Sequence, residues 1–227
     1  MRQILYGEHW IHPEEPQEIR DIFIRKGKFT KFRSGTKLLH GGPSGQITLI
    51  TKGICLYRFE DWQDRTHIFS LIVPNRVAGD IDAACCNVAN VDAVAMCSCE
   101  GYVLPYDVWH REIYSDLHLL QQFTANVIKK QECHIEALLA CFTMEIDMRL
   151  RSFFRAFIQA YAPLKTDDWN KIPIRLSTTL IAEIISASRT SVSLILSKWS
   201  REGLLCKKGN ALYIHGGAFH DLSDWWI

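Results

Sequence analysis

The spacing of apolar residues changes once along this chain, close to Pro105. Before that point, short segments rich in strand-forming residues, such as 28–32 and 66–73, are separated by turn residues. A series of short strands at regular intervals is typical of a β-barrel or a β-sandwich. After Pro105 the apolar residues follow steps of three, four and seven, which is the period of an α-helix. We therefore expect an α+β protein whose strands come first.

The predicted strands cover most of the first half of the chain. They are residues 28–32, 37–40, 47–51, 54–59, 66–73, 93–97 and 102–104. The polar run 60–64 is expected to form the tip of a hairpin, and residues 1–27 are expected to form one or two short helices.

A single apolar stripe predicts a long helix after the strands. Its members are Leu117, Leu120, Val127, Ile128, Ile135, Leu138, Leu139 and Phe142. The charged residues of this segment lie off the stripe, and they are Lys129, Lys130, Glu132 and Glu136. A helix of roughly 30 residues is about 45 Å long, so one small barrel cannot cover its whole stripe. Pairing with a second copy of the chain would cover it, and two core helices broken near Gln131 are the alternative.

The last part of the chain contains two short amphipathic segments separated by a tight turn. Ser177 is a good N-cap for a helix over 180–185, and residues 186–188 interrupt the pattern. In a second helix, over 189–199, the apolar side chains share one face: Val192, Ile195, Leu196 and Trp199. Because the opposite face of this helix is small and polar, the pair predicts a helix-turn-helix.

A basic hairpin and an uneven charge distribution extend this interpretation. Residues 204–208 and 211–215 flank a Gly-Asn turn and predict a hairpin, so that the module would be a winged helix. The whole chain has a formal net charge of +1, but residues 149–227 carry 11 Lys and Arg against 6 Asp and Glu. Residues 1–148 carry 15 against 19. A polyanionic partner is therefore expected for the C-terminal part alone.

The residues predicted to contact double-stranded DNA combine positive charge with hydrogen-bonding groups. Arg189 can form a bidentate pair with guanine or bind a phosphate, and hydroxyl groups can contact bases or phosphates. The helix N-termini near Ser177 and Ser188 present backbone N–H groups that suit phosphates. The predicted contacts are Ser177, Thr178, Ser188, Arg189, Thr190, Ser191, Ser193, Lys198, Lys207 and Lys208.

In order and spacing, these features resemble the CRP/FNR family of bacterial transcription regulators across nearly the whole chain. The most specific stretches are residues 181–192, which contain Ser188 and Arg189, and residues 202–205. Weaker matches are Gly35, Gly53, Gly79, Asp80, Leu104, Pro105, Arg149 and Leu150. The chain departs from the family pattern at Ser186, where the turn usually has glycine, and at Thr190 and Leu194, where the family often has charged base readers. A different operator is therefore expected.

The resemblance implies a fold, domain boundaries and partners. A double-stranded, jelly-roll-like β-roll would sense an effector over residues 1–108, followed by a dimerisation helix over 109–143 and a winged-helix DNA-binding domain over 144–227. The expected partners are double-stranded DNA with two-fold related half-sites and a second copy of the chain, with RNA polymerase as a further candidate. The expected activity is transcription regulation by a protein that is not an enzyme, because the sequence has no recognisable catalytic arrangement.

The resemblance also places an effector pocket in the β-roll. Cyclic-nucleotide binders of this family pair an acidic residue on the ribose with an arginine on the phosphate. Here Asp80 matches the acid, but Asn90 stands at the arginine position, and no Lys or Arg lies between Arg76 and Arg111. A buried phosphate without a cationic partner is costly, so we expect an unknown small-molecule effector rather than a cyclic nucleotide, and no cofactor. The predicted pocket residues are Gly79, Asp80, Ile81, Asn90, Val91, Val127 and Ile128.

Two further interpretations remain open at this level. A regulator responding to redox state or metal could use the β-roll cysteines Cys85, Cys86, Cys97 and Cys99, although residues 1–54 contain no cysteine and buried thiols usually act as small apolar side chains. Haem ligation by His40, His67 or His118 is a weaker alternative. A binding or scaffold protein is the other interpretation, since Leu194 suits a winged helix that contacts protein. With no apolar run near 20 residues and no secretion signal, we expect a cytoplasmic protein with reduced cysteines and no membrane contact.

Overall fold

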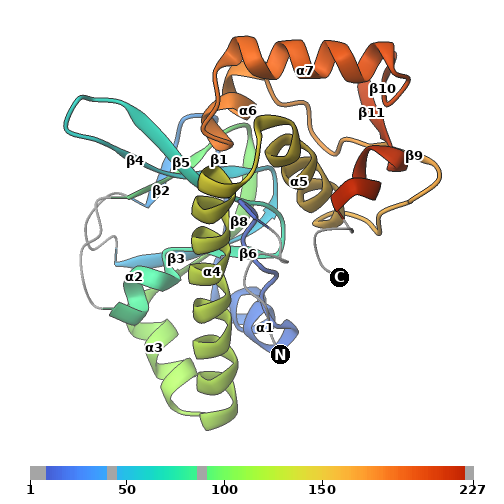
Figure 1. Ribbon diagram of the computed structural model, residues 1–227. Coiled ribbons are helices and arrows are strands. Elements are labelled where there is room, and N and C mark those ends of the chain that lie inside the picture. The colour runs from blue at the N-terminus through green and yellow to red at the C-terminus, as the bar shows by residue number, and fades with distance from the viewer. Residues whose placement is uncertain (1–8, 40–44, 86–90, 223–227) are drawn as a thin grey trace. The chain divides into compact units, whose positions relative to one another are not determined.

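The computed structural model describes residues 9–39, 45–85 and 91–222 (Figure 1). The chain forms two compact units, one over Ile11–His134 and the other over Met1–Trp10 together with Ile135–Ile227. Strands dominate the first unit and helices dominate the second, and the long helix α4, Leu117–Thr143, has residues in both. The predicted change from strands to helices is confirmed.

The first unit is built from two antiparallel sheets. Its strands are β1 (Lys28–Phe32), β2 (Lys37–Leu39), β3 (Gln46–Lys52), β4 (Cys55–Glu60), β5 (Thr66–Ile72), β6 (Arg76–Ala78), β7 (Asp92–Ala95) and β8 (Cys99–Pro105). Its helices besides α4 are α1 (Gln17–Lys26), α2 (Asp80–Cys85) and α3 (Tyr106–Tyr114). One sheet has the order β1-β8-β3-β6 and the other β2-β7-β4-β5, so strands far apart in sequence lie side by side. This is the predicted β-roll.

Two apolar cores hold this unit together. One packs α1 and α3 against the first sheet, with Phe23 and Trp109 fully buried beside Ile47. The other takes residues from both sheets, including Ile50 and Cys55. Burying each large apolar side chain stabilises the fold by about 1.5–3 kcal/mol, so these two clusters supply much of the favourable free energy of this unit.

The hairpin of β4 and β5 has the predicted polar tip. The Asp61 carboxylate accepts hydrogen bonds from the backbone N–H groups of Gln63 and Arg65, at 2.8 and 3.0 Å. Such a turn closed by an Asp side chain explains why the two strands end at Glu60 and Thr66. The tip leaves Trp62 87% exposed.

Some elements of the β-roll differ from the sequence prediction. The strands β6 and β8 are not fully anticipated, and α2 occupies a stretch with no predicted element. Gly79 introduces α2 with a φ of +93°, a conformation that glycine adopts at little cost. The strand predicted over 93–97 ends at Ala95, so Cys97 lies in the turn before β8 and does not share a strand with Cys99.

The helical stretch after Pro105 is two helices. Asp116 separates them, and its Oδ1 accepts hydrogen bonds from the N–H groups of His118 and Leu119, at 2.8 and 3.3 Å, which caps the start of α4. From Leu117, α4 runs for 27 residues without interruption at Gln131, close to the predicted length. The alternative of two helices broken near Gln131 is therefore wrong.

Part of the α4 stripe is not covered by the rest of the chain. Leu117 at the start of the helix is 70% exposed, and further along the helix four apolar residues are about half exposed or more: Ile128 (52%), Ile135 (47%), Leu138 (57%) and Phe142 (77%). They follow steps of seven, three and four residues, so they lie on one side of the helix. Lys130 and Glu136 of the same helix are buried, although their charge sets them off the stripe.

The second unit combines helices with a small sheet. Its elements after α4 are α5 (Ile146–Gln159), β9 (Trp169–Lys171), α6 (Thr178–Ile184), α7 (Arg189–Arg201), β10 (Leu205–Lys208), β11 (Ala211–His215) and the 3₁₀ helix η1 (Gly216–Leu222). Phe153, Phe154 and Phe157 of α5 are buried in its core. None of the helices in the described ranges is long and apolar enough to cross a membrane alone, and α6 with α7 reaches that length only across a 111° bend.

The wing of this unit is larger than predicted. The hairpin of β10 and β11 forms as expected, but β9 pairs antiparallel with β11 to give a three-stranded sheet of order β10-β11-β9. The polar run 167–170 predicts a loop from the sequence, but Trp169 and Asn170 belong to the strand β9. The Asn170 side chain is buried and exchanges hydrogen bonds with the backbone of Lys165, at 2.8 and 2.9 Å. That pairing satisfies a polar residue inside a short strand.

Candidate nucleic-acid interface

Helices α6 and α7 form the predicted helix-turn-helix. The hydroxyl of Ser177 accepts a hydrogen bond from the N–H of Leu180 at 3.1 Å and caps α6. The chain then bends by 111° into α7, within the range of helix-turn-helix motifs. Ser186 lies in the turn with a φ of +52°, at the position where the family resemblance implies that glycine is usual. A left-handed serine costs free energy, so the surrounding structure has to hold it.

Arg149 of α5 supplies that support. Its Nη1 donates hydrogen bonds to the carbonyl oxygens of Ile185 and Ser186, at 3.2 and 3.1 Å, and its Nε donates to the carbonyl of Met144 at 2.9 Å. The first two carbonyls belong to the end of α6, where helix geometry leaves them without an internal partner. Arg149 therefore fixes the turn, a role that the sequence pattern alone does not reveal.

Helix α7 is anchored through Trp199. This side chain is fully buried, and its Nε1–H donates a hydrogen bond to Oδ1 of Asp147 at 2.8 Å. The other oxygen of Asp147 accepts from Nε of Arg151 at 2.6 Å, and the Arg151 guanidinium lies 5.2 Å from the Trp199 ring. A charged, part-buried network of this kind is stronger than neutral hydrogen bonds. The burial of Trp199 agrees with the sequence prediction, whereas Asp147 and Arg151 were not predicted.

The outer face of α7 presents a small set of polar groups. Arg189, Thr190, Ser193 and Lys198 are exposed along it, and so is Leu194 at 66%. Two of the predicted hydroxyl contacts are already engaged, because Ser188 caps α7 by accepting from the N–H of Ser191 at 3.0 Å and also bonds to the Ser191 hydroxyl at 2.8 Å. Arg189, Thr190 and Ser193 therefore remain as the groups near the N-terminus of α7 that are free to read bases.

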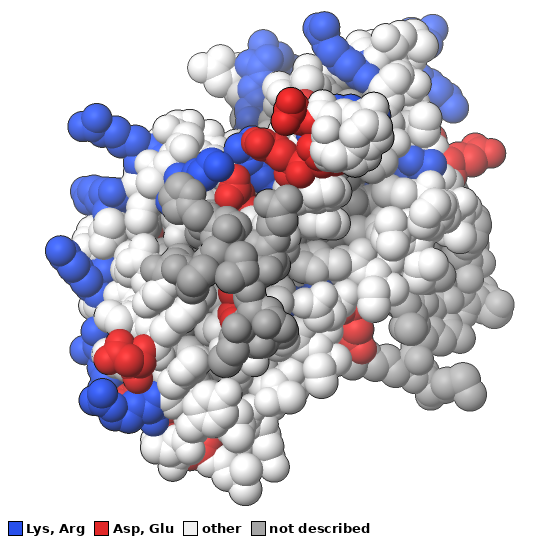
Figure 2. All heavy atoms as spheres, turned by 90° about the vertical axis from the view of Figure 1, so that its left-hand side faces the viewer, with Lys and Arg blue, Asp and Glu red and all other residues white. Residues whose placement is uncertain are grey.

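The remaining predicted contacts lie beside this helix. Ser177 is exposed and Thr178 half-buried at the start of α6, and Arg175, which was not predicted, is exposed just before them. Lys207 and Lys208 are exposed on β10 and, as neighbours on a strand, point to opposite faces. The Lys208 ammonium lies 5.9 and 5.5 Å from the rings of Trp169 and Tyr213. In Figure 2, basic side chains project along the upper edge of the view, the level at which α7 lies in Figure 1.

The predicted effector residues fall in the β-roll unit, where a buried ionic cluster takes up Asp80. The ammonium of Lys130, on α4, is fully buried and contacts the carboxylates of Asp80 and Glu15, and the Asn126 amide donates to Glu15 at 2.5 Å. Sequence reasoning missed Lys130 because its partners are 50 and 115 residues away. Burial alone would lower the pKa of Lys130, but the charges of Asp80 and Glu15 raise it. Burial raises the pKa of Glu15, and Lys130 offsets part of that rise.

Of the other predicted effector residues, some lie next to this cluster and others do not. Gly79 and Ile81 flank Asp80, and Val127 packs against the core formed by α1, α3 and the first sheet. Val91 is half-buried beside the other core, whereas Ile128 is 52% exposed on the α4 stripe. Asn90 lies outside the described residues. The structure therefore brings Asp80 to Lys130 and turns Ile128 outward.

Asp82 shares the acidic environment of Asp80 and gives a pH-dependent prediction. Burial, and secondarily the charge of Asp80, raise its pKa to about 6. A carboxyl group whose pKa is raised on folding stabilises the fold below its unfolded pKa of about 4, and this stabilisation is lost as the pH rises through about 6. We expect Asp82→Asn to raise the free energy of unfolding by roughly 1–3 kcal/mol at pH 7.5 and to have little effect at pH 4. Urea unfolding at both pH values measures this, with the exposed Asp167→Asn as the control that gains nothing.

The cysteines of the β-roll sit in a mostly buried group. Sγ of Cys55 lies 3.9 Å from Sγ of Cys99, both residues are fully buried, and Cys97 is half-buried nearby. Hydrogen bonding from Cys55, against the effect of burial, lowers the pKa of Cys99 to about 7. The side chain of Cys85 and all of Cys86 lie outside the described part of the chain. The Cys99 thiol has one hydrogen, which it can donate to the carbonyl oxygen of Ile54 or of Cys97, each at 3.3 Å, and this is the arrangement of a satisfied core residue.

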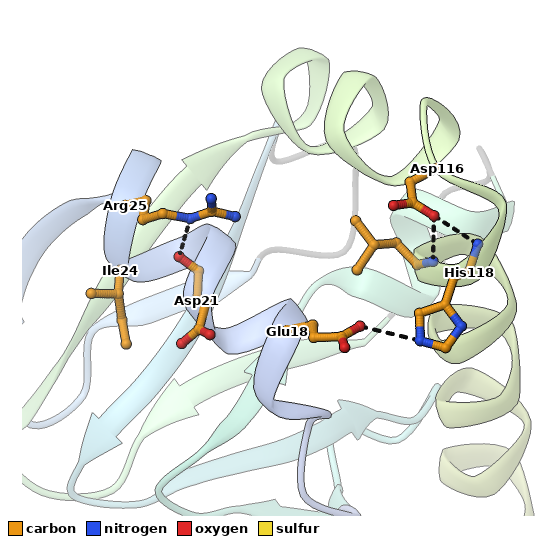
Figure 3. A pocket seen from close by; sticks show the side chains of 7 residues that line it. Glu18, Asp21, Ile24, Arg25, Asp116 and His118 are labelled. Carbon is orange, nitrogen blue, oxygen red and sulfur yellow. Dashed lines mark hydrogen bonds and ion pairs between the residues drawn. The ribbon is translucent and has the colours of Figure 1, made fainter.

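An open hollow on the β-roll unit lies between α1 and the start of α4 (Figure 3). Glu18 from α1 and His118 from α4 meet across it at 3.3 Å, and Asp116 is engaged in capping α4. Asp21 and Arg25 belong to the α1 side, where Arg25 Nε donates to the backbone carbonyl of Asp21. The hollow contains none of the predicted effector residues. His118 is paired with an acid at the surface, and His67 is likewise paired with Asp61 at 2.8 Å.

Comparison with known proteins agrees with the geometry. Residues 149–216 match the Crp-like helix-turn-helix domain. FixK2 from Bradyrhizobium japonicum superposes with a TM-score of 0.74 at 13% identity, over 86% of this chain and 96% of that one. CLP of Xanthomonas campestris, described as a c-di-GMP-responsive global regulator, gives 0.68 at 14% identity, over 88% and 100%. A CRP/FNR-family transcriptional regulator from Thermus thermophilus gives 0.66 at 14% identity, over 87% and 98%.

No curated protein matches the chain in sequence. At such low identities, the solved structures show a shared fold. The predicted order of β-roll, long helix and winged helix is confirmed.

Proposed function

Because residues 149–216 form a Crp-like helix-turn-helix domain and the chain has the fold of the CRP/FNR transcription regulators, we propose that this protein is a dimeric, sequence-specific DNA-binding regulator. Each subunit would place α7 in a major groove, and the β-roll unit would respond to an effector. The proposal gives the chain no catalytic role.

The exposed polar face of α7 carries this proposal. On the buried side of the helix, Trp199 is hydrogen-bonded to Asp147. Arg149 is hydrogen-bonded to the turn at Ser186, and this turn sets the direction of the helix. The outer side then presents Arg189, whose guanidinium suits the paired acceptors of guanine in the major groove. Helix α7 also contains no Asp or Glu, so its own side chains do not repel a phosphate backbone.

The exposed stripe on α4 supports dimerisation. Ile128, Ile135, Leu138 and Phe142 follow the spacing of a coiled-coil seam, in which apolar residues of two helices interdigitate. Two-fold related subunits would place two α7 helices in successive major grooves about one helical turn apart. An operator with two inverted half-sites, roughly 10 base pairs between centres, is therefore expected.

Selection from random DNA tests the proposal without knowledge of the operator. The full-length protein is incubated with random duplexes at low salt, and the retained molecules are sequenced over several rounds. Enrichment of a two-fold symmetric motif with half-sites about 10 base pairs apart is the expected result. Retention of no motif at low salt would contradict the proposal.

We expect Arg189→Ala to weaken binding to the selected operator by about 1–3 kcal/mol and to relax the preference at one base pair in each half-site. Fluorescence anisotropy with the operator and with single-base variants measures both effects. Arg201→Ala at the opposite end of α7 is the matched control, because it removes the same charge from a position remote from the N-terminus of the helix. That control is expected to leave base preference unchanged.

The wing gives the contrasting result. Replacing Lys207 and Lys208 with alanine is expected to lower affinity on all sequences alike and to reduce the slope of log K against log salt by up to about 2. Lys207 should account for most of the change, because the Lys208 ammonium already lies over two aromatic rings. If Arg189→Ala and the double wing variant both bind like the wild type, α7 does not occupy the groove.

The effector is proposed to be a small molecule other than a cyclic nucleotide. The ammonium of Lys130 is fully buried and bonded to both Asp80 and Glu15, so two carboxylates already balance its charge and a phosphate beside it would add uncompensated negative charge. Asp80, in turn, is unavailable to a ribose unless this buried pair is broken, which costs several kcal/mol. Incubation with cyclic AMP or cyclic GMP is therefore expected to leave the melting temperature unchanged.

A protein-binding role for the winged helix is the second candidate. Leu194 is 66% exposed in the middle of the outer face of α7, where an apolar side chain can pack against a protein or against a thymine methyl group. Leu194→Ala distinguishes the two: altered preference at a thymine position supports DNA contact, and unchanged DNA binding supports the alternative.

A further inference from the structure

A small hollow in the second unit lies between the strand β9 and the tip of the wing hairpin. Its volume is about 250 Å³. One wall is formed by the segment from Lys171 to Arg175, and the other by Asn210, Ala211 and Leu212 around the start of β11. Pockets that hold organic ligands usually measure roughly 300–1,000 Å³, so this hollow suits a compact chemical group.

Backbone pairing fixes the two walls side by side. Lys171 lies opposite Tyr213 in the antiparallel pairing of β9 with β11. The N–H of Ile172 then donates a hydrogen bond to the carbonyl oxygen of Leu212 at 2.9 Å. Pro173, whose ring restricts its own backbone, lines the hollow next. No strand is predicted here from the sequence, so the hollow is visible only in the structure.

The charged groups that line the hollow are positive. Lys171 and Arg175 are exposed, and no Asp or Glu lines the hollow among the described residues. Within the same part of the chain neither of these two side chains has an ion-pair partner, whereas Lys165, which precedes β9, is paired with Asp168 at 3.0 Å. Asn210 adds an exposed amide that can donate hydrogen bonds. Two cations and an amide donor around one small space fit an anion with several acceptor oxygens.

We propose that Lys171, Arg175 and Asn210 bind one backbone phosphate of the operator DNA in each half-site. The charge of a phosphodiester is spread over its non-bridging oxygens, so the planar guanidinium and the compact ammonium can share it from two sides. Such a contact presupposes the proposed DNA binding and extends it to β9 and the segment that follows this strand.

The place of the hollow in the fold favours DNA over a free phosphate-bearing molecule. Its Asn210 wall belongs to the turn of the hairpin that carries Lys207 and Lys208. Arg175 comes three residues before α6, the first helix of the helix-turn-helix. Two exposed cations bind a free phosphate only weakly, because water screens them, whereas a duplex already bound through α7 presents its phosphates at high effective concentration.

Neutralising one phosphate at a time in the selected operator, as a methylphosphonate, tests the site with the full-length protein. The double variant Lys171→Gln with Arg175→Gln is expected to bind the unmodified operator about tenfold more weakly than the wild type. Its slope of log K against log salt should fall in magnitude by about 1. At one phosphate of each half-site, the methylphosphonate should weaken the wild type and leave the affinity of the variant unchanged, because the contact is already lost.

A matched variant separates a bound phosphate from a general effect of charge. Lys165→Gln with Arg201→Gln removes two exposed positive charges from the same module outside the hollow. This control is expected to keep the sensitivity of the wild type at every phosphate. Inorganic phosphate alone is expected to leave the melting temperature of the wild type unchanged.

The outcomes distinguish this site from the proposed function. If the Lys171 and Arg175 variant keeps the sensitivity of the wild type at every phosphate while Arg189→Ala still relaxes base preference, the phosphate site is wrong and the proposed function stands. If selection from random DNA yields no operator, both fail. Saturable binding of inorganic phosphate that the double variant loses would show a site for a free phosphate and overturn the assignment to DNA.

Discussion

Replacing Leu138 and Phe142 with glutamate is expected to convert the proposed dimer to a monomer and to weaken operator binding by roughly 100- to 10,000-fold. Both side chains are exposed on α4, at 57% and 77%, so the substitutions add charge to the seam without disturbing the folded chain. The large loss in DNA affinity follows because a monomer bound at one half-site does not bring a second α7 to the other half-site at high effective concentration. Light scattering after size-exclusion chromatography gives the mass, and fluorescence anisotropy gives the affinity.

A matched variant separates a seam effect from a general effect of charge. Lys129→Glu changes charge on the same helix at an exposed position off the stripe. It is expected to leave the mass of the dimer and its DNA affinity close to those of the wild type. A double variant that remained a dimer at micromolar concentration would show that the exposed stripe serves another purpose, and far-ultraviolet circular dichroism would verify that it is folded.

Replacing Lys130 with methionine is expected to lower the free energy of unfolding by about 3–5 kcal/mol. The change removes the cation from a cluster in which the Lys130 and Glu15 side chains are 0% and 1% exposed and that of Asp80 is 3% exposed. Two carboxylates would then share a buried site without a counter-charge, which is far more costly than losing a surface ion pair. Urea unfolding followed by tryptophan fluorescence measures the loss.

The loss should depend on pH in a defined direction. Without Lys130, the pKa of Glu15 rises further, so the deficit relative to the wild type should shrink as the pH falls and this carboxyl group takes up a proton. Lys129→Met, an exposed neighbour, is expected to change stability by no more than about 0.5 kcal/mol. Adding Glu15→Gln and Asp80→Asn to Lys130→Met should recover part of the loss. A Lys130→Met protein as stable as the wild type would contradict the buried cluster.

The elements that the sequence predicted well are those set by neighbouring residues. Ser177 and Ser188 predicted two helix starts, because a cap needs only a backbone N–H three residues later. The family resemblance placed Ser186 in the turn, and the structure adds that its backbone is left-handed. The length of α4 followed from the period of its apolar residues. Local chemistry decides all of these.

The elements that were missed depend on partners far along the chain. The strand β9 has three residues and exists because β11, about 40 positions later, pairs with it. Lys130 carries a charge that marks it as a surface residue, and only the fold brings Glu15 and Asp80 to it. Arg149 could be matched to a family pattern, but its hydrogen bonds to the α6–α7 turn could not be derived from the spacing of residues in the sequence. Long-range pairing leaves little trace in a single sequence.

The caps of α7 have a consequence for how many genes a regulator of this kind could control. The hydroxyls of Ser188 and Ser191 bond to each other and to the start of the helix, so in the proposed regulator Arg189, Thr190 and Ser193 would be the polar groups left to discriminate bases. Each mismatch typically costs about 1–3 kcal/mol, and only where a contact exists. With so few base-reading residues, we expect a degenerate consensus operator. The sequence-dependent flexibility of base-pair steps that the protein does not contact would supply the remaining selectivity. Such a regulator would act at many promoters and occupy them to different degrees.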